Sequence, residues 1–386
     1  MIRVGIIGVG NIGFAHATAI YENKIPLLKL SALCDIDPKR IEKLRQLYPT
    51  VHMYADADTM LQSETLDAII IATPHYDHPT LALRAFSCGL HVLSEKPIGV
   101  YCENARKAVE ASKKSGKIYA MMFNQRTNKL FRLAKDLIEA GELGELKRSV
   151  WIVTNWYRTQ EYYDSGNWRA TWAGEGGGVL MNQAPHNLDL WQWLCGMPTE
   201  ISAQCNTGRF HPIEVEDEAT ILARYENGAS GVFITSTGDL PGTNRLEITG
   251  TKGTLLLEHK TLTLHRLSKD EREYCFSSDS SAPSVETTVW EDEPYQGHHR
   301  VLENFGRAIL YGDPLVASGE EALKELTLSN AAYLSAWQGR PISLPLDDAE
   351  YFAELQKRIH TSQPKHVSAS VHESEAMYNK RWDTNW

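Results

Sequence analysis

The sequence is poor in cysteine, in long apolar runs and in positive charge. Its six cysteines are scattered, with no C-x-x-C pair and no cysteine/histidine cluster at zinc spacing, so we expect free thiols in a reducing cytoplasm and no metal site. No segment approaches the roughly 18 to 20 uncharged apolar residues that span a bilayer, and glycine interrupts the apolar opening Met1–Gly8, which argues against a signal peptide. We therefore expect a soluble cytoplasmic protein without a membrane partner. The formal net charge of −10 also argues against a nucleic-acid partner.

The chain of 386 residues is long enough for two or three domains, and its first third alternates apolar runs with helical periodicity. Strands are predicted at 2–7, 28–34, 68–71, 91–93 and 117–123, and helices at 11–22, 38–47, 79–88 and 103–114. Alternating strands and helices are typical of right-handed βαβ units. We therefore predict a doubly wound parallel sheet in a domain that covers residues 1–124.

The pattern changes beyond about Gly144, where short strand-like runs are separated by Gly, Pro, Asn and Asp. These runs are 150–153, 200–208, 219–225, 231–237, 245–249, 253–257 and 261–267. Asn227-Gly228 lies between two of them and predicts a tight hairpin. We expect a mostly antiparallel sheet in a domain of residues 125–345, with Asp270–Glu293 as a variable loop or lobe insertion. Helical periodicity returns at 300–310, 320–337 and 349–359, and residues 346–386 form an expected C-terminal helix and tail.

A glycine-rich loop identifies a class of cofactor. Gly8–Gly13 reads G-x-G-x-x-G between the first strand and the first helix, and Asp35 ends the second strand. Such glycines let a pyrophosphate approach the helix N-terminus, and an acid at this distance accepts hydrogen bonds from the adenosine ribose. Because Asp35 would repel a 2′-phosphate, NAD is favoured over NADP. The nearby Lys39 and Arg40 keep that preference open.

Three further segments carry a family resemblance: Ala72–His78 after one strand, Ser94–Pro97 (Ser-Glu-Lys-Pro) after the next, and the glycine-rich Gly176–Asp189. Together with the glycine loop they closely resemble the glucose-fructose oxidoreductase and inositol dehydrogenase (Gfo/Idh/MocA) family, from residue 2 to about residue 344. The resemblance implies an α/β protein with an N-terminal Rossmann domain, which is a doubly wound parallel sheet. It also implies a C-terminal α+β domain with a large, mostly antiparallel open sheet, and NAD(P)-dependent redox chemistry.

The resemblance matches Lys96 and His186 to the residues that usually carry catalysis. Oxidising a secondary alcohol needs a group that takes the hydroxyl proton and a cation beside the developing alkoxide, and these two residues fit both needs. Asn182, His186 and Asp189 share one helical face, and Asn182 stands where many family members have aspartate. We expect His186 as acid/base, oriented by Asn182 or Gln183, and Lys96 as alkoxide stabiliser and alternative base.

The expected site residues form a catalytic set, a cofactor-binding set and a substrate-binding set. The catalytic set comprises Lys96, His186 and Asn182. The expected cofactor-binding residues are Gly8, Gly10, Asn11, Ile12, Gly13, Asp35, Thr73, Pro74, His78, Glu95, Lys96 and Asn124. A stretch crowded with aromatic and polar side chains adds substrate residues, although those aromatics would equally pack a domain junction. The substrate set is Lys96, Trp156, Arg158, Trp168, Arg169, Asn182, Gln183 and His186. His298 and His299 fit a solvated helix N-terminus better than a site.

Three functions are compatible with these residues. The first is an NAD-dependent dehydrogenase, which transfers a hydride between the nicotinamide and a secondary hydroxyl or ketone of a sugar, glycoside or inositol-like cyclitol. The second cleaves glycosides through transient oxidation at C3 and recycles its NAD. The third is a non-catalytic NAD-binding regulator, which the retained Lys96 and His186 disfavour. We expect a small-molecule carbohydrate or cyclitol as the partner. We also expect a homodimer or homotetramer, because an open sheet has a face that needs cover.

Overall fold

The computed structural model describes residues 1–63, 65–294, 296–363 and 365, which form two compact units. The first unit comprises Met1–Thr127 and the described residues of Tyr295–Thr327. The second comprises Asn128–Pro294 and the described residues of Leu328–Trp386. The first unit thus consists of two segments that are separate in sequence. The expected division at residues 124 and 345 assigned one continuous segment to each domain. Those boundaries remain predictions.

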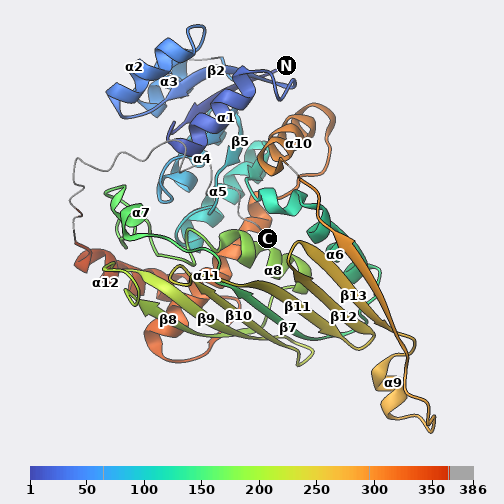
Figure 1. The fold of residues 1–386 in the computed structure, drawn as a ribbon. Helices are drawn as coiled ribbons and strands as arrows, with labels where there is room; N and C mark the ends of the chain where they lie inside the picture. Colours follow the sequence, from blue (N-terminus) through green and yellow to red (C-terminus); the bar gives the residue numbers. More distant parts are fainter. Residues whose placement is uncertain (64, 295, 364, 366–386) are drawn as a thin grey trace. The chain divides into compact units, whose positions relative to one another are not determined.

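Among the described residues of the first unit, six strands form one parallel sheet in the order β3-β2-β1-β4-β5-β6. Figure 1 labels β2 and β5 of this sheet. The strands are β1 (Ile2–Ile7), β2 (Leu28–Cys34), β3 (His52–Tyr54), β4 (Ala68–Ile71), β5 (His91–Ser94) and β6 (Tyr119–Met121). The helices are α1 (Asn11–Tyr21), α2 (Pro38–Leu47), α3 (Ala57–Ser63), α4 (Asp77–Ser87), α5 (Cys102–Ser115), the short 3-10 helix η1 (Asn124–Thr127) and α10 (Gly297–Tyr311). The predicted doubly wound sheet is confirmed.

The strands at the centre of this sheet are apolar because helices cover them. Every residue of β4 is fully buried, and β1 is buried at five of its six positions. Since all the strands are parallel, β1, β4 and β5 end at one edge of the sheet. The segments that follow them begin at Gly8, Ala72 and Glu95, so this edge gathers the three motifs of the first unit.

In the described part of the second unit, nine strands form a sheet in the order β14-β13-β12-β11-β7-β10-β9-β8-β15. Neighbouring strands are antiparallel except β10 and β7. The strands are β7 (Leu146–Val153), β8 (Glu200–Thr207), β9 (Glu216–Arg224), β10 (Ser230–Ser236), β11 (Asn244–Gly250), β12 (Gly253–Glu258), β13 (Thr261–Leu267), β14 (Val285–Glu291) and β15 (Ile342–Ser343). The helices are α6 (Lys129–Glu139), α7 (Gln160–Asp164), α8 (Pro185–Cys195), α9 (Glu271–Cys275) and α12 (Asp348–Thr361), while α11 (Gly319–Gln338) begins in the first unit and ends in the second.

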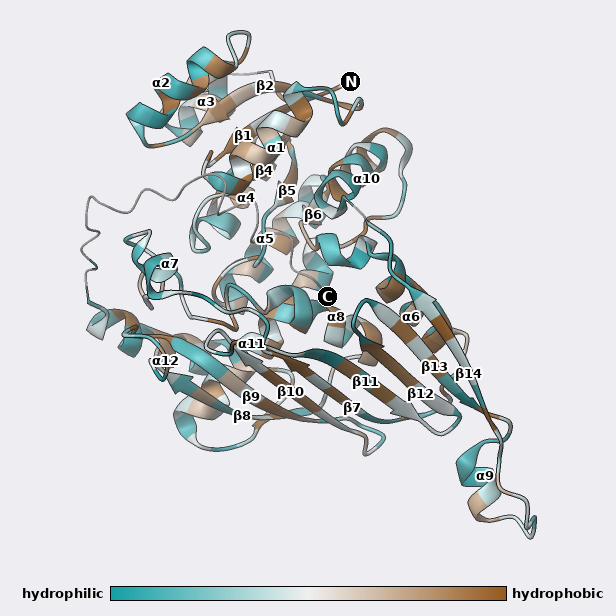
Figure 2. Cartoon of the chain, viewed as in Figure 1, coloured by the Kyte–Doolittle hydropathy of each residue, from teal (hydrophilic) through white to brown (hydrophobic). Residues whose placement is uncertain are grey.

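The strands of this sheet alternate between buried and partly exposed residues, as expected for a sheet covered on one face. The pattern is regular along β12, and Figure 2 shows the alternation of brown and teal along several of these strands. The predicted hairpin joins β9 to β10, where Gly228 has the positive φ of 84° that a tight turn requires. The predicted mostly antiparallel sheet is therefore confirmed.

The structure differs from the local expectations at three places. Asp270–Glu293 is not simply a loop, because it contains α9 and β14, and β14 pairs with β13 along its whole length. Alternating Val, Thr and Trp within Val285–Glu291 form this edge strand despite the charged and serine-rich surroundings. The sequence analysis also omitted β3, α3, α6, α7 and β15. Finally, α8 begins only at Pro185, so Asn182 lies in the turn before the helix.

The expected helix at 349–359 is present as α12. The expected tail beyond it lies outside the described residues from residue 366 onward. Within the described part of the chain, no helix is both long enough and apolar enough to cross a membrane.

Candidate functional site

The loop between β1 and α1 has the compactness that a dinucleotide requires. Gly8 has a positive φ of 85°, and a Cβ atom there would lie 2.6 Å from the Ala72 carbonyl oxygen. A Cβ atom at Gly13 would lie 2.0 Å from the Gly8 carbonyl oxygen, whereas one at Gly10 would meet nothing within 4 Å. Gly10 caps α1 without a side-chain hydrogen bond, which leaves the helix N-terminus open to an anion. The glycine pattern thus gives a tight turn that leaves space for a ligand at Gly10.

Two buried oxygen atoms of the first unit, one of them beside this loop, support a ligand there. Within the described part of the chain, Thr73 Oγ1 and Asn124 Oδ1 are buried and have no hydrogen-bond partner. Thr73 follows β4, and its methyl carbon lies 2.9 Å from the Cβ position at Gly8. Buried polar atoms are normally paired, so unpaired ones mark places where a ligand or water binds. The residues of the first unit therefore fit a dinucleotide.

Asp35 lies beside the glycine loop and is almost fully buried. Its carboxylate accepts hydrogen bonds from the backbone N–H groups of Val9, at 2.8 Å, and Asp37, at 3.0 Å. Arg40 on α2 also donates to both carboxylate oxygens, at 3.1 and 2.9 Å. The guanidinium group reduces the negative charge that would reject a 2′-phosphate, and is itself a phosphate ligand. We therefore expect Arg40 to moderate the preference for NAD.

Replacing Arg40 with alanine should sharpen that preference. We expect the ratio of kcat/KM with NAD to kcat/KM with NADP to rise about tenfold, because one charge-assisted contact to a phosphate is lost. Arg45→Ala on the same helix is the matched control, since Arg45 pairs with Glu42 instead. An unchanged ratio, or improved use of NADP, would show that Arg40 does not moderate the preference.

The segments that follow β4 and β5 are tied together through His78. Its ring lies within the first turn of α4 and is almost fully buried. Nδ1 lies 2.7 Å from the Pro97 carbonyl oxygen, and Nε2 lies 2.7 Å from the Thr73 carbonyl oxygen. Burial lowers the pKa of His78. A neutral ring has one N–H, so it donates to only one of these two carbonyl oxygens, and both ring nitrogens of His78 lie against protein atoms.

A buried pair of charged groups precedes Lys96. The Glu95 carboxylate lies 2.8 Å from His16 Nε2 and accepts the Lys96 backbone N–H at 3.3 Å. Burial would raise the pKa of Glu95, but the His16 hydrogen bond and the charges of His16, His298 and Lys96 outweigh burial and lower it to about 2. Glu95 is therefore ionised, and its carboxylate fixes the backbone at Lys96.

The expected solvated position is wrong for His298. The ring centroids of His298 and His16 are 5.8 Å apart, and Asn124 Nδ2 donates to His298 Nδ1 at 3.4 Å. Burial, followed by the charge of His16, lowers the pKa of His298 to about 4, so the ring is neutral near pH 7. Sequence reasoning missed His16 altogether. Its position on the buried face of α1 was the available signal.

In the second unit, the glycine run before α8 is held by Glu216 of β9. The fully buried carboxylate accepts the backbone N–H groups of Gly178, at 3.0 and 3.1 Å, and Leu180, at 2.9 Å, and the Tyr333 hydroxyl at 2.7 Å. A Cβ atom at Gly177 would lie 2.1 Å from the Tyr333 hydroxyl oxygen. These contacts fix the turn that leads to His186. Glu216 is a positioning residue that the sequence reading did not identify.

Burial raises the pKa of Glu216 from 4.5 to about 7, although its hydrogen bonds oppose the rise. Tyr333 and Cys205 face it from α11 and β8, and burial raises the pKa of each of them. Because the native state keeps its proton to higher pH than the unfolded state, Glu216 contributes stability below about pH 4.5. That contribution disappears as the pH rises through about 7, and it amounts to about 3 kcal/mol.

Glu216→Gln should abolish this pH dependence. Between about pH 5 and about pH 8, the free energy of unfolding should fall by about 2 kcal/mol more in the wild-type protein than in the variant. Urea unfolding followed by tryptophan fluorescence measures the second unit, since all ten tryptophans lie outside the sequence of the first. Glu218→Gln on the same strand is the control and should keep the wild-type slope. Equal slopes for wild type and Glu216→Gln would refute the assignment.

Tyr162 forms hydrogen bonds with three of the predicted substrate residues. Its hydroxyl accepts hydrogen bonds from Arg169 at 2.8 Å and from Asn182 and Gln183 at 3.2 Å each. Asn182 also donates to the buried carboxylate of Glu175. The amides that were expected to orient His186 are therefore bound to Tyr162 and Glu175. Neither residue was named from the sequence.

The tryptophans between residues 156 and 172 differ in their surroundings: some contact polar groups, and one packs in the core. Trp156 Nε1 donates to Asn187 Oδ1 at 3.1 Å, beside the buried His186 on α8. The Arg169 guanidinium carbon lies 4.6 Å from the centre of the Trp168 ring. In contrast, Trp172 is buried edge-on against Tyr333, so it packs the core of the unit.

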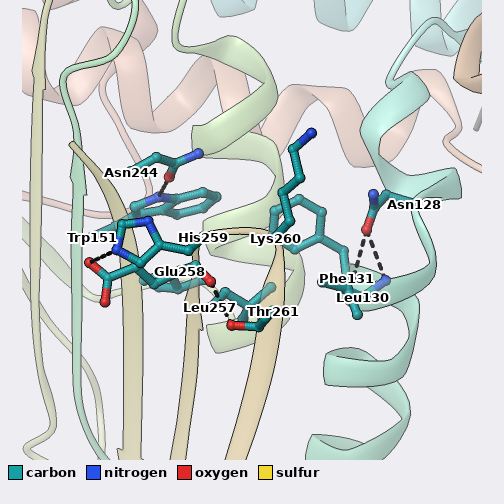
Figure 3. Close-up of a pocket in the computed structure, with 11 residues that line it drawn as sticks. Asn128, Leu130, Phe131, Trp151, Asn244, Leu257, Glu258, His259, Lys260 and Thr261 are labelled. Carbon is teal, nitrogen blue, oxygen red and sulfur yellow. Dashed lines mark hydrogen bonds and ion pairs between the residues drawn. The ribbon is translucent and has the colours of Figure 1, made fainter. Parts of the chain in front are cut away.

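A separate hollow of the second unit contains none of the predicted substrate residues. Figure 3 shows it between the start of α6 and the hairpin of β12 and β13, with Trp151 Nε1 donating to Asn244 at 2.9 Å. His259 and Lys260 line it at the hairpin turn. Among the described residues, no group of three or more His, Cys, Asp or Glu side chains is placed to hold a metal ion.

Two models of one protein family match the chain. The model described as an oxidoreductase family with an NAD-binding Rossmann fold matches residues 2–123. The model described as the GFO/IDH/MocA C-terminal domain matches residues 131–256. The two matches lie one after the other along the chain.

Similar proteins cover most of the chain. It is 23% identical to the myo-inositol 2-dehydrogenase of Thermotoga maritima, over 89% of this chain and 98% of that protein. It is 27% identical to the D-apiose dehydrogenase of Paraburkholderia graminis, over 83% and 84%. The WlbA dehydrogenase from Bordetella pertussis, solved in complex with NADH and UDP-GlcNAcA, aligns with a TM-score of 0.75 and 28% identity, over 90% of this chain and 99% of that chain.

Proposed function

Because the chain belongs to the Gfo/Idh/MocA family of NAD-binding oxidoreductases, we propose that it transfers a hydride between NAD and a secondary hydroxyl of a sugar, glycoside or cyclitol. One observation of the structure carries this proposal. The glycine loop, the unpaired Thr73 hydroxyl and the Glu95-Lys96 segment share one edge of the parallel sheet. That edge is where open α/β sheets bind their ligands.

The proposed chemical roles belong to Lys96 and His186. Lys96 supplies a cation that stabilises the developing alkoxide, and the Glu95 contact with its backbone N–H holds it in place. His186 takes the hydroxyl proton during oxidation and returns it during reduction. The glycine loop, Thr73 and Asn124 bind the cofactor, and Asp35 binds its ribose. Bound NAD supplies the hydride acceptor.

The substrate set is proposed from the second unit. Trp156, Trp168 and the side chains around Tyr162 combine aromatic faces with amide and guanidinium donors, which is the composition that binds sugar hydroxyls. Two similar proteins are named as dehydrogenases of myo-inositol and D-apiose, which are a cyclitol and a sugar. Their names support a polyhydroxylated substrate of about that size. A homodimer or homotetramer and a cytoplasmic location remain predictions.

The proposal is tested by incubating the protein with NAD and a panel of free sugars, inositols and aryl glycosides. We expect the absorbance of reduced nicotinamide to rise with one of these groups. Glycoside cleavage without a net rise would favour the second reading from the sequence, in which C3 is oxidised transiently and NAD is recycled. Absence of both activities across the panel would contradict both enzymatic readings.

A further inference from the structure

Arg158 has hydrogen-bond donors that the protein does not use. Nη1 donates to the backbone oxygens of Trp156, at 3.3 Å, and Tyr157, at 2.9 Å. Nε is buried and has no hydrogen-bond partner, and Nη2 forms no hydrogen bond with any described residue. Among the residues that the structure describes, no carboxylate pairs with this guanidinium group. Because buried polar atoms are normally paired, the unpaired Nε marks a place where an acceptor group of a ligand would bind.

The backbone of Arg158 is fixed on both sides. Its N–H donates to the Thr237 carbonyl at 2.9 Å, and its carbonyl accepts from His211 Nε2 at 2.9 Å. His211 Nδ1 lies 3.0 Å from the fully buried Asp217, whose carboxylate also accepts three backbone N–H groups, those of residues 209–211. This chain of contacts holds the arginine in place before any ligand binds, as a preorganised site requires.

Arg158 also lies next to the segment that leads to His186. Its guanidinium carbon is 5.0 Å from the centre of the Tyr162 ring, and the Tyr162 hydroxyl accepts hydrogen bonds from Asn182 and Gln183. Gln183 Oε1 is a second buried atom without a partner in the described part of the chain. The Nε and Nη2 donors of Arg158 and the Oε1 acceptor of Gln183, which have no partners among the described residues, thus lie next to the Tyr162 side chain.

We propose that Arg158 binds a carboxylate or phosphate of the substrate, so that the substrate is an acidic sugar or cyclitol derivative. The proposal rests on the proposed function, because it names the substrate of that site. The Nε–Nη2 edge carries two parallel donors that no described residue uses, a geometry that suits a carboxylate or phosphate better than a single hydroxyl. Gln183 Oε1 would then accept a hydroxyl of the same molecule.

Several charged side chains lie in the segment around Arg158. Arg169 adds a second guanidinium group, 4.6 Å from the centre of the Tyr162 ring. The buried Glu175 offsets one positive charge, and its oxygens accept from Ala170 N–H and Asn182. Asp164 of α7 pairs with Lys365 at 3.2 Å.

Binding calorimetry in the presence of saturating NAD tests the proposal without requiring hydride transfer. The panel contains hexuronates, their neutral uronamides, hexose 6-phosphates and neutral hexoses. At least one acid should bind about tenfold or more tightly than its neutral counterpart. Preference for a hexuronate or for a hexose phosphate identifies which anion is used. Equal binding of acids and neutral counterparts, or binding of neither, would overturn the proposal.

Variants of Arg158 locate the preference. Arg158→Gln should reduce the ratio of acid to amide affinity to about one. Arg158→Lys keeps the positive charge but loses the two parallel donors of the guanidinium group, so it should keep a smaller preference for the acid. The matched control is Arg209→Gln, which removes one positive charge from an arginine that pairs with Glu218. An undiminished ratio in Arg158→Gln or Arg158→Lys would refute the assignment. If acids keep their preference but no sugar yields reduced NAD, the proposed function fails and the Arg158 site stands.

Discussion

Lys96→Met is expected to lower turnover by at least about a hundredfold and to leave NAD affinity within about threefold of wild type. Methionine keeps the length of the side chain but removes the cation that stabilises the alkoxide. The backbone N–H of residue 96 still bonds to Glu95, so the structure around it should persist. Steady-state kinetics and calorimetry with NAD separate the two effects.

A matched control for Lys96 is Lys114→Met, on the exposed surface of α5 in the same unit. It should keep wild-type turnover. Near-normal turnover in Lys96→Met would remove Lys96 from catalysis. A collapse of NAD affinity together with turnover would instead make its role one of cofactor binding.

His186→Gln is expected to have an effect of similar size, because general acid–base catalysis contributes about 100-fold to 10,000-fold. Glutamine retains hydrogen-bonding capacity in a buried position but cannot exchange a proton near neutral pH. We expect kcat to fall far more than KM rises, since substrate contacts from Arg158 and Gln183 remain.

His360→Gln is the control for this substitution, because His360 is exposed on α12 of the same unit. If His186→Gln raises KM and spares kcat, His186 binds substrate and does not transfer the proton. Lys96, the alternative base from the sequence analysis, would then take that role.

The fold was predictable where local pattern and burial agree. The buried strand β4 is an uninterrupted apolar run, and the glycine loop occurs between a strand and a helix, so both were found from sequence. The strand β14 was missed because its residues are largely exposed and it relies on pairing with β13. Edge strands of this kind carry little burial signal.

The residues that position the site were not predictable, because their partners are distant in sequence. Glu216 bonds to Tyr333, 117 positions away, and His16 bonds to Glu95, 79 positions away. A motif search finds groups adjacent along the chain, whereas these pairs exist only once both sheets have formed. The reactive residues were therefore proposed from sequence, and the contacts that hold their segments came from the structure.

The measurement that tests the central claim most directly follows a deuterium atom from substrate to cofactor. The first substrate from the panel is deuterated at the carbon that carries the reacting hydroxyl, and the nicotinamide is analysed after a single turnover. We predict that deuterium appears at C4 of the nicotinamide. Formation of ketone or cleaved product with no deuterium on the nicotinamide would contradict hydride transfer as the reaction of this protein.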